Sequence, residues 1–358
     1  MNIKYMKMAI ELAKKGKHKV FPNPQVGCVI VKDNKVVGKG WHKHFGGEHA
    51  EINAIKDAGK NAKDADLYVT LEPCNNYGKR SPCTLAILNA KIKRVFYSIK
   101  DKKNFRTKEF LEKNGVEVYE GLLKDESAVL IKDYLKHLKI KSLVSIKAAM
   151  TLDGKIATKE YDSKWITSKK ARDFVHKIRS LYEAVLVGKN TALKDNPLLT
   201  SRSKNLRNPI RVVIDPKLEL PKHYSLLNGK ASTIIFYDKN ILKIPKYFKE
   251  DSIILVPIDI EASKKNFNLI INKLSSFSIK RVLIEGGGEI IASALFSNVI
   301  DNIYFFIAPK IIGGKMSIPI VGGQGVKKIS ESLNIKDIKI KKIGVDLLIT
   351  GNIDKSNC

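Results

Sequence analysis

The sequence contains few cysteines, few arginines and no long apolar run. Its 358 residues include four cysteines, Cys28, Cys74, Cys83 and Cys358. These are too few and too scattered for a disulfide framework, which favours a reducing compartment. No run approaches the roughly 20 apolar residues of a membrane-spanning helix, and the N-terminal segment lacks the continuous apolar core of a signal peptide. We therefore expect a cytoplasmic protein that does not associate with a membrane.

The scarcity of arginine bears on the strong positive charge. The net charge is +29, yet only nine of the 65 basic residues are arginine, the residue best suited to bidentate contacts with phosphates and base edges. The lysines are spread along the chain among many isoleucines and asparagines. A compositional bias that gives a basic, solvated surface explains this pattern better than a nucleic-acid-binding face. We expect no nucleic-acid partner, although the charge would attract phosphorylated small molecules.

What is present indicates a globular protein with two domains. Hydrophobic residues make up 44% of the chain, with 12 tyrosines and 13 phenylalanines, as in ordinary globular proteins. The length suggests about two domains. A charged helical pattern over 124–139 gives way to a strand-like segment at Leu143. The predicted domains are therefore 1–142 and 143–358.

The first domain alternates helices and strands. The order α-β-β-α-β-α-β favours a three-layer α/β domain. The predicted helices span 3–15, 49–58 and 82–91, and the predicted strands span 26–31, 36–41, 66–71 and 94–98.

Four residues of this domain combine into a metal-site pattern. His49-x-Glu51 is followed by Pro73-Cys74 and, after eight further residues, by Cys83. One imidazole and two thiolates would give zinc three protein ligands and leave one position open for a water, whose pKa the metal lowers. Glu51 is then free to move protons, as in zinc deaminases that act on nucleobase-like rings. Positions i and i+2 of a helix do not share a face, so His49 and Glu51 can converge only from a first turn.

Two other interpretations of the same residues exist. The cluster could be a structural zinc site, or Cys74 and Cys83 could be buried core thiols. A structural site usually has four protein ligands, and no further Cys or His lies close to Cys74 or Cys83 in the sequence.

Four segments of the first half share the pattern of a known family. They are Pro22-Asn23-Pro24-x-Val26-Gly27, Gly40-x-His42, His49-Ala50-Glu51 and Glu72-Pro73-Cys74 with Cys83 nine positions later. On these segments, the first half resembles the pyrimidine deaminase of riboflavin biosynthesis. The eight-residue gap between the cysteines differs from the two-residue gap of cytidine and tRNA deaminases. The resemblance implies a cytidine-deaminase-like fold, zinc bound by His49, Cys74 and Cys83, and Glu51 as the proton shuttle. It also implies that Asn23, His42 and Lys79 contact the substrate.

Some of these residues have ordinary structural explanations, and some depart from the family. Asn23 would otherwise be a turn residue, and His42 a surface histidine at a strand end. Asn75-Asn76 stands where the family usually has Ser-His, so a substrate-contacting histidine is replaced by an amide. Residues 101–106 form a shortened version of a Pro- and Gly-rich loop. Both departures concern substrate affinity and not the type of reaction.

The second half predicts another α/β domain, with a mainly parallel sheet. The loop Glu285-Gly286-Gly287-Gly288 joins a strand to a helix, where glycines and a helix N-terminus suit a phosphate. Such a turn can also be purely structural. The predicted strands span 143–148, 184–187, 210–214, 232–237, 252–256, 281–284 and 302–307, and the predicted helices span 169–180, 267–276 and 289–297.

Five segments of this half share the pattern of a second family. They are Lys147-x-Ala149-x-Thr151-Leu152-Asp153-Gly154, Ser163-x-Trp165-Ile166-Thr167, Thr191 through Asp195-Asn196-Pro197-Leu198-Leu199-Thr200-x-Arg202, Glu285-Gly286-Gly287, and Ala308-Pro309 through Gly313-Gly314. On these segments, the second half resembles the reductase that accompanies the same deaminase and has a dihydrofolate-reductase-like fold. The resemblance implies NADPH as the second cofactor. The implied NADPH contacts are Ala149, Trp165, Thr191, Asp195, Gly287 and Gly288. The implied substrate contacts are Lys147, Ser163, Arg179, Leu199, Arg202 and Glu285.

Several of these residues could have structural roles instead of contacting a ligand. Arg179 and Arg202 suit a ribose phosphate by charge and by the fork geometry of the guanidinium. Without the resemblance, Arg179 could be an interhelical ion-pair partner, Trp165 a core aromatic and Asp195 a turn residue. Asn196 replaces a second Asp of the family, which leaves Asp195 in place.

Together the two resemblances cover nearly the whole chain and imply a bifunctional deaminase–reductase, which the family suggests is a dimer or tetramer. Zinc would serve the first domain and NADPH the second. One rival is a deaminase for nucleosides or nucleic acid with a reductase-like tail. Another is a binding or structural protein with an inactive zinc site, against which the intact Glu51 argues.

Overall fold

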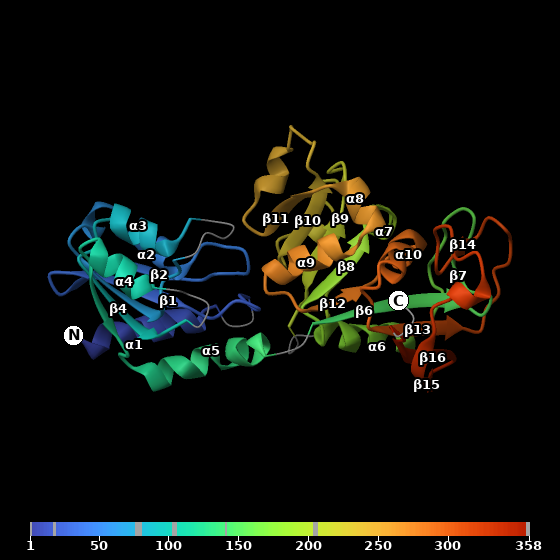
Figure 1. Ribbon diagram of the computed structural model, residues 1–358, viewed down its shortest axis with the longest axis horizontal. Coiled ribbons are helices and arrows are strands. Elements are labelled where there is room, and N and C mark those ends of the chain that lie inside the picture. The colour runs from blue at the N-terminus through green and yellow to red at the C-terminus, as the bar shows by residue number, and fades with distance from the viewer. Residues whose placement is uncertain are drawn as a thin grey trace. The chain divides into compact units, whose positions relative to one another are not determined.

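The computed structural model describes residues 2–16, 19–75, 81–101, 106–139, 142–202 and 207–355. The chain divides into two compact units, Met1–Ile140 and Lys141–Cys358 (Figure 1). None of the described helices is both long and apolar enough to cross a membrane. Three residues discussed above, Asn76, Lys79 and Cys358, lie outside the described residues, as does most of the 101–106 loop.

The first unit is a five-stranded sheet with helices on both faces. The strand order is β2-β1-β3-β4-β5, with β1 antiparallel to β2 and β3 and with β3, β4 and β5 parallel. The elements are α1 (Ile3–Lys14), β1 (Gly27–Lys32), β2 (Lys35–Trp41), α2 (Ala50–Ala58), β3 (Asp66–Leu71), α3 (Cys83–Asn89), β4 (Arg94–Ile99), α4 (Thr107–Lys113), β5 (Glu117–Glu120) and α5 (Lys124–Leu138). The predicted elements are confirmed to within about two residues at either end, whereas α4 and β5 were not predicted.

Alternation along β1 builds the two faces of this sheet. Cys28 and Ile30 pack with the alanines of α2, whereas Val29 and Val31 pack with α1. This is the period-two pattern expected of a strand that is buried on both sides. Cys28 is therefore a core thiol, as predicted, and its pKa is raised by burial and by the nearby Glu51.

Glycine on β2 allows α2 to approach the sheet closely. A Cβ atom at Gly40 would collide with the backbone carbonyl oxygen of Ala50 and the backbone nitrogen of Ala54. Only glycine avoids this contact. The N-terminal turn of α2 is therefore held directly against the sheet.

The second unit contains a nine-stranded sheet. The strand order is β11-β10-β9-β8-β12-β6-β13-β16-β15. The seven strands from β11 to β13 are parallel, and β16 and β15 continue the sheet antiparallel. The predicted, mainly parallel sheet is thus confirmed. Its strands are β6 (Leu143–Thr151), β8 (Ala184–Gly188), β9 (Ile210–Ile214), β10 (Thr233–Asp238), β11 (Ile253–Ile258), β12 (Arg281–Ile284), β13 (Asn302–Ala308), β15 (Ile335–Ile343) and β16 (Asp346–Ile353).

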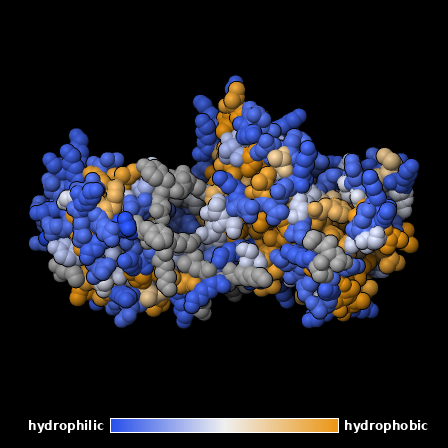
Figure 2. All heavy atoms as spheres, in the orientation of Figure 1, coloured by the Kyte–Doolittle hydropathy of each residue, from blue (hydrophilic) through white to orange (hydrophobic). Residues whose placement is uncertain are grey.

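The helices of the second unit are α6 (Lys169–Ser180), α7 (Lys189–Asp195), α8 (Ile260–Lys265), α9 (Asn268–Ser276) and α10 (Gly288–Phe296), and the short strands β7 (Lys155–Ala157) and β14 (Ile318–Pro319) form a separate ribbon. The three predicted helices correspond to α6, α9 and α10. The two terminal strands, β15 and β16, were not predicted. Hydrophobic atoms gather on the exposed surface over these strands (Figure 2), where Ile338, Ile340 and Leu347 are exposed.

Candidate active sites

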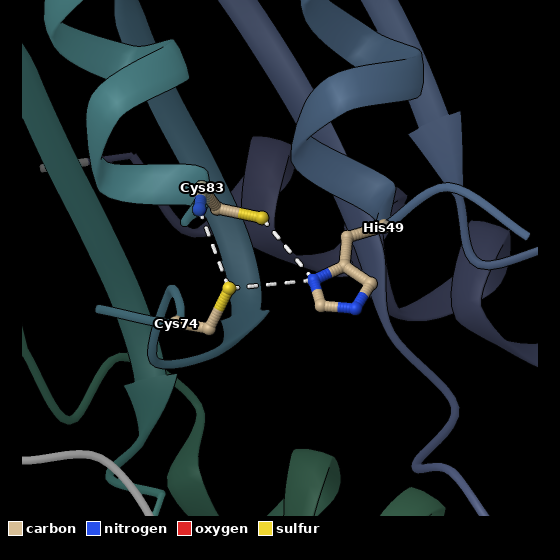
Figure 3. Close-up of side chains that lie close together, drawn as sticks. All are labelled: His49, Cys74 and Cys83. Atoms are coloured by element: carbon tan, nitrogen blue, oxygen red, sulfur yellow. Dashed lines mark hydrogen bonds between the residues drawn. The ribbon is translucent and has the colours of Figure 1, made fainter. Parts of the chain in front are cut away.

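Three chain segments of the first unit bring the predicted metal ligands together. His49 is the N-cap residue of α2, Cys74 follows the end of β3, and Cys83 is the first residue of α3. The Nδ1 atom of His49 lies 3.2 Å from the Sγ atom of Cys83 and 3.5 Å from that of Cys74 (Figure 3). All three ligand atoms lie within 4.8 Å of one another. The N-termini of α2 and α3 and the end of β3 thus hold the three ligand atoms close enough for one metal ion.

The donor set fits zinc. Histidine nitrogen and two cysteine sulfurs are ligands that zinc prefers, and a three-residue set is typical of sites that leave one position open. Among the described residues, the group contains no fourth His, Cys, Asp or Glu. The pKa of Cys74 is lowered to about 4, chiefly because Cys83 donates a hydrogen bond to it. The pKa of Cys83 is raised, because it keeps the shared proton and is buried.

Glu51 lies beside these ligands in the first turn of α2. Its side chain is only 3% exposed. Burial raises its pKa to about 7, while the nearby His49 lowers it and Cys74 raises it. A carboxyl group with a pKa near neutrality can both accept and release a proton. The predicted convergence of His49 and Glu51 from one helix N-terminus agrees with this arrangement.

A network of hydrogen bonds holds the loop that carries Cys74. The backbone N–H of Cys83 donates to the Cys74 Sγ over 3.3 Å, and the backbone N–H of Thr84 donates to the Cys74 carbonyl over 3.2 Å. The Thr84 hydroxyl donates to the Asn75 side-chain oxygen over 2.9 Å. Asn75 thus connects the two cysteine-bearing segments. From the sequence it was recognised only as a departure from the family.

Asn23 and His42 lie next to the metal ligands. The His42 Nε2 lies 3.1 Å from the Asn23 side-chain nitrogen, and the His42 Nδ1 lies 2.9 Å from the Glu48 carbonyl oxygen. The His42 ring meets the His49 ring edge-on, with centroids 5.7 Å apart. His42 is 3% exposed, so it is not a surface histidine. The expected substrate contact Lys79 lies outside the described residues.

The second unit gathers charged residues where adjacent parallel strands end. Lys147 lies on β6, and Glu285 follows β12, which lies between β8 and β6 in the sheet. Arg179 of α6 donates to both carboxylate oxygens of Glu285, over 2.7 and 3.0 Å. The Lys147 Nζ lies 3.6 Å from Glu285. Carboxyl ends of parallel strands are the usual ligand-binding edge of an α/β sheet.

The buried charges of this cluster depend on one another. Burial alone would raise the pKa of Glu285, but Arg179 and Lys147 outweigh it and hold the pKa near 2. The pKa of Lys147 is lowered by burial, although Glu285 opposes the shift. Arg179 therefore forms an ion pair, the alternative considered from sequence, with the loop after β12 rather than with another helix.

The residues expected to contact NADPH lie beside this cluster. Thr191 and Asp195 belong to α7, which directly follows β8, and Ser163 donates to Asp195 over 3.4 Å. Gly287 is the N-cap residue of α10 and Gly288 its first residue. A Cβ atom at Gly287 would lie 3.6 Å from the Thr191 hydroxyl, whereas one at Gly288 would lie 2.7 Å from the Pro319 carbonyl oxygen. The backbone is therefore open at Gly287 and closely packed at Gly288, and the open position at this helix N-terminus suits an anionic group such as a phosphate.

The remaining expected residues differ in exposure. Ala149 lies on β6, two residues after Lys147. Trp165 is 62% exposed, with the Arg172 guanidinium 4.3 Å above its ring, so it is not a core aromatic. Leu199 is buried in the core. Arg202 is exposed and has a φ of 53°, a strained left-handed conformation for a non-glycine residue.

Family models match both units. Residues 1–99 match the cytidine and deoxycytidylate deaminase zinc-binding region, and residues 142–349 match the RibD C-terminal domain. The riboflavin biosynthesis protein RibD of Aquifex aeolicus is 40% identical over 353 residues, which cover 96% of each chain. That of Escherichia coli is 31% identical and covers 96% of this chain and 97% of its own.

A solved structure is similar along the same length. The deaminase/reductase of Thermotoga maritima, described as a diaminohydroxyphosphoribosylaminopyrimidine deaminase/5-amino-6-(5-phosphoribosylamino)uracil reductase, is 35% identical. It covers 98% of both chains with a TM-score of 0.52.

Fold and sites define a two-unit α/β enzyme with a deaminase-type metal site in its first unit. The chain belongs to the family of the riboflavin biosynthesis protein RibD. It is a bifunctional deaminase and reductase of riboflavin biosynthesis, and its cofactors are zinc and NADPH.

Proposed function

We propose that the first unit removes the exocyclic amine of a 2,5-diamino-6-(phosphoribosylamino)pyrimidinone. The second unit then reduces the ribosyl group of the product to a ribityl chain. The observation that carries this proposal is the meeting of His49, Cys74 and Cys83 beside the buried Glu51. The substrate is that of the Thermotoga maritima relative, as its description states. The deaminase domain would comprise residues 1–142 and the reductase domain residues 143–358.

In the first unit, the side chains position water and move protons. His49, Cys74 and Cys83 would hold zinc, which when bound would lower the pKa of a water molecule. Glu51, with its pKa near 7, would accept a proton from water and deliver it to the departing amine. Asn23 and His42 would hold the pyrimidine ring, together with Lys79. Asn76 takes the place of the family's histidine, and an amide there can still donate a hydrogen bond.

In the second unit, the side chains orient the sugar and the nicotinamide. NADPH supplies the hydride, and the protein supplies orientation and charge. Lys147 and Glu285 would contact the sugar, while Ser163, Arg179, Leu199 and Arg202 would hold the remainder of the substrate. The cofactor would lie against Ala149, Trp165, Thr191, Asp195, Gly287 and Gly288. The ion pairs of Glu285 keep these groups in fixed positions.

The proposed sequence of reactions can be tested with one optical signal. Zinc-loaded protein should oxidise NADPH when given only the deaminase substrate, because hydride transfer waits for deamination. The signal should vanish in Glu51→Ala and return when the deaminated intermediate is supplied. If the wild-type protein oxidised NADPH with the deaminated intermediate but not with the deaminase substrate, the first unit would be impaired. Absence of oxidation with both compounds would contradict the bifunctional assignment.

We further propose a cytoplasmic homo-oligomer, a dimer or tetramer, that binds neither nucleic acid nor membrane. The exposed apolar side chains of Ile338, Ile340 and Leu347 on the two terminal strands of the sheet support the homo-oligomer. Exposed apolar patches often mark interfaces between subunits. Light scattering of the purified protein would give the oligomeric state. Binding to RNA at moderate salt would instead support the nucleic-acid rival.

A further inference from the structure

His176 of α6 lies one turn before Arg179 and shares an acceptor with it. The His176 Nδ1 lies 3.3 Å from the carbonyl oxygen of Thr200. The Arg179 Nη1 also donates to this carbonyl over 3.3 Å and lies 3.4 Å from the His176 Nδ1. The carbonyl belongs to the segment between Leu199 and Arg202, both of which have a positive φ. His176 and Arg179 therefore hold the strained segment that carries Arg202.

These contacts define which imidazole nitrogen can change its protonation. A guanidinium nitrogen and a protonated Nδ1 can both donate to one carbonyl, which has two lone pairs. In the neutral ring the Nδ1 then carries the hydrogen and the Nε2 carries a lone pair. Among the described residues, the Nε2 has no hydrogen-bond partner. His176 can therefore bind a proton at Nε2 without giving up its contact with Thr200.

The charges around His176 come from several elements. Asp173 and Arg179 lie on α6 itself. Arg202 faces it from the loop after α7, and Glu285 from the loop after β12. Burial, followed by the two arginines, lowers the pKa of His176. The charge of Glu285 is already balanced by Arg179 and Lys147. At neutral pH His176 is therefore mainly uncharged, within a site where positive charge prevails.

We propose that His176 is a third contact for the phosphate of the reductase substrate, beside Arg179 and Arg202, and that it takes up a proton when the phosphate binds. The inference rests on the proposed function, which supplies a phosphoribosyl group. A phosphate monoester carries nearly two negative charges above its second pKa of about 6. The Arg179 Nη1 lies 3.4 Å from the His176 Nδ1, so a phosphate bound by Arg179 would lie close to the imidazole. Its negative charge would stabilise the imidazolium and raise the pKa of the histidine. The proton comes from solvent and binds at the Nε2.

This coupling has a defined sign. The complex binds one more proton than the free partners, so binding weakens as the pH rises through the pKa of His176 in the complex. Below a pH of about 6 the phosphate itself becomes protonated, which opposes the trend. A shift of one pKa unit corresponds to about a tenfold change in affinity. The KM for the phosphorylated substrate should therefore rise roughly three- to tenfold between about pH 6.5 and 8.5, with little change in kcat.

The test compares the wild type with His176→Gln. Glutamine can still donate to the Thr200 carbonyl but does not titrate. Reductase KM and kcat would be measured with the deaminated substrate and saturating NADPH across this pH range. The matched control is His223→Gln, because His223 is an exposed histidine of the same unit. We expect the rise in KM to disappear in His176→Gln and to remain in the control.

The outcomes separate this inference from the proposed function. An unchanged pH dependence of KM in an active His176→Gln enzyme would overturn the role of His176 and leave the reductase assignment intact. A wild-type KM that does not change with pH would also overturn the role of His176 and leave the reductase assignment intact. If the wild type reduced no phosphorylated substrate, the proposed function and the inference would fail together. A substrate that lacks the phosphate should show no dependence on His176, and an equal dependence would also contradict the proposal.

Discussion

At the scale of single residues, the proposed deaminase mechanism assigns the proton transfer to Glu51. We expect Glu51→Gln to lower deaminase turnover by roughly 10²- to 10⁴-fold, because the amide cannot carry a proton between water and the leaving amine. The zinc content should stay close to that of the wild type, since the ligand atoms of His49, Cys74 and Cys83 are untouched. Ammonia release and metal analysis of the same sample would measure both.

The matched control is Glu48→Gln, three residues earlier, where the carboxylate pairs with the exposed Lys56. It should retain turnover. Normal turnover with normal zinc content in Glu51→Gln would contradict the role of Glu51.

A second residue-scale prediction concerns Glu285 and acid. Its pKa is near 2 in the folded protein, below the value of about 4.3 in an unfolded chain. Its contribution to stability is therefore complete above the unfolded pKa and is lost as the pH falls from about 5 toward 2. Glu285→Gln should lose about 3–5 kcal/mol at neutral pH, because it leaves buried positive charges unpaired. The difference from the wild type should shrink as the pH falls.

Calorimetry at several pH values between neutrality and pH 3 would follow this difference. The exposed Glu261, which pairs with Lys264 on α8, provides the control substitution Glu261→Gln. A constant difference between wild type and Glu285→Gln across this range would refute the linkage.

The sequence predicted which residues form the candidate metal site better than it predicted the contacts that candidate site residues make. The pattern His49-x-Glu51, Cys74 and Cys83 predicted a cluster that the fold brings together. The bidentate pairing of Arg179 with Glu285 could not be predicted, because the two residues lie 106 positions apart and meet only through the order of the strands. The bond between Asn75 and Thr84 depends on loop geometry that a spacing pattern does not contain.

At the scale of elements, the position of α2 depends on the glycine of β2. Gly40→Ala would place a methyl group against the backbone of Ala50 and Ala54. Overpacking of this kind lowers the free energy of unfolding by about 1–3 kcal/mol. To avoid the methyl group, α2 would move away from β2, together with the turn that carries His49 and Glu51. We expect lower thermal stability together with weaker zinc retention against a chelator. The neighbouring Lys39→Ala is the control, and equal zinc retention in both variants would contradict this explanation.

The elements that were not predicted have identifiable physical reasons. The strand β5 has only four residues, with one buried side chain among them. Its sequence therefore lacks the alternation of apolar and polar residues by which a strand is predicted. The strand β15 is exposed along 336–342 and rich in lysine, so its hydrophobic pattern does not distinguish a core face. Strands with continuous buried runs, such as β8 and β9, were predicted closely. Burial, rather than length alone, makes an element recognisable in the sequence.

At the scale of the whole molecule, the two proposed active sites use separate sets of residues. The three proposed metal ligands belong to Met1–Ile140, and the Lys147–Glu285–Arg179 cluster belongs to Lys141–Cys358. Each unit has its own hydrophobic core. Removal of zinc by a chelator should therefore abolish deamination and leave reduction of the deaminated substrate unchanged. NADPH oxidation measured separately with each substrate, before and after chelation, would show this.

Addition of zinc should restore the coupled reaction, which controls for irreversible damage by the chelator. A parallel loss of both activities that zinc reverses would mean that the reductase depends on the metal-bound state of the first unit. Because the second unit contains no comparable His/Cys group among its described residues, such a loss would have to be transmitted from the first unit. Hydrogen exchange along β6 and β12 in the metal-free protein would then reveal whether the reductase sheet itself had loosened.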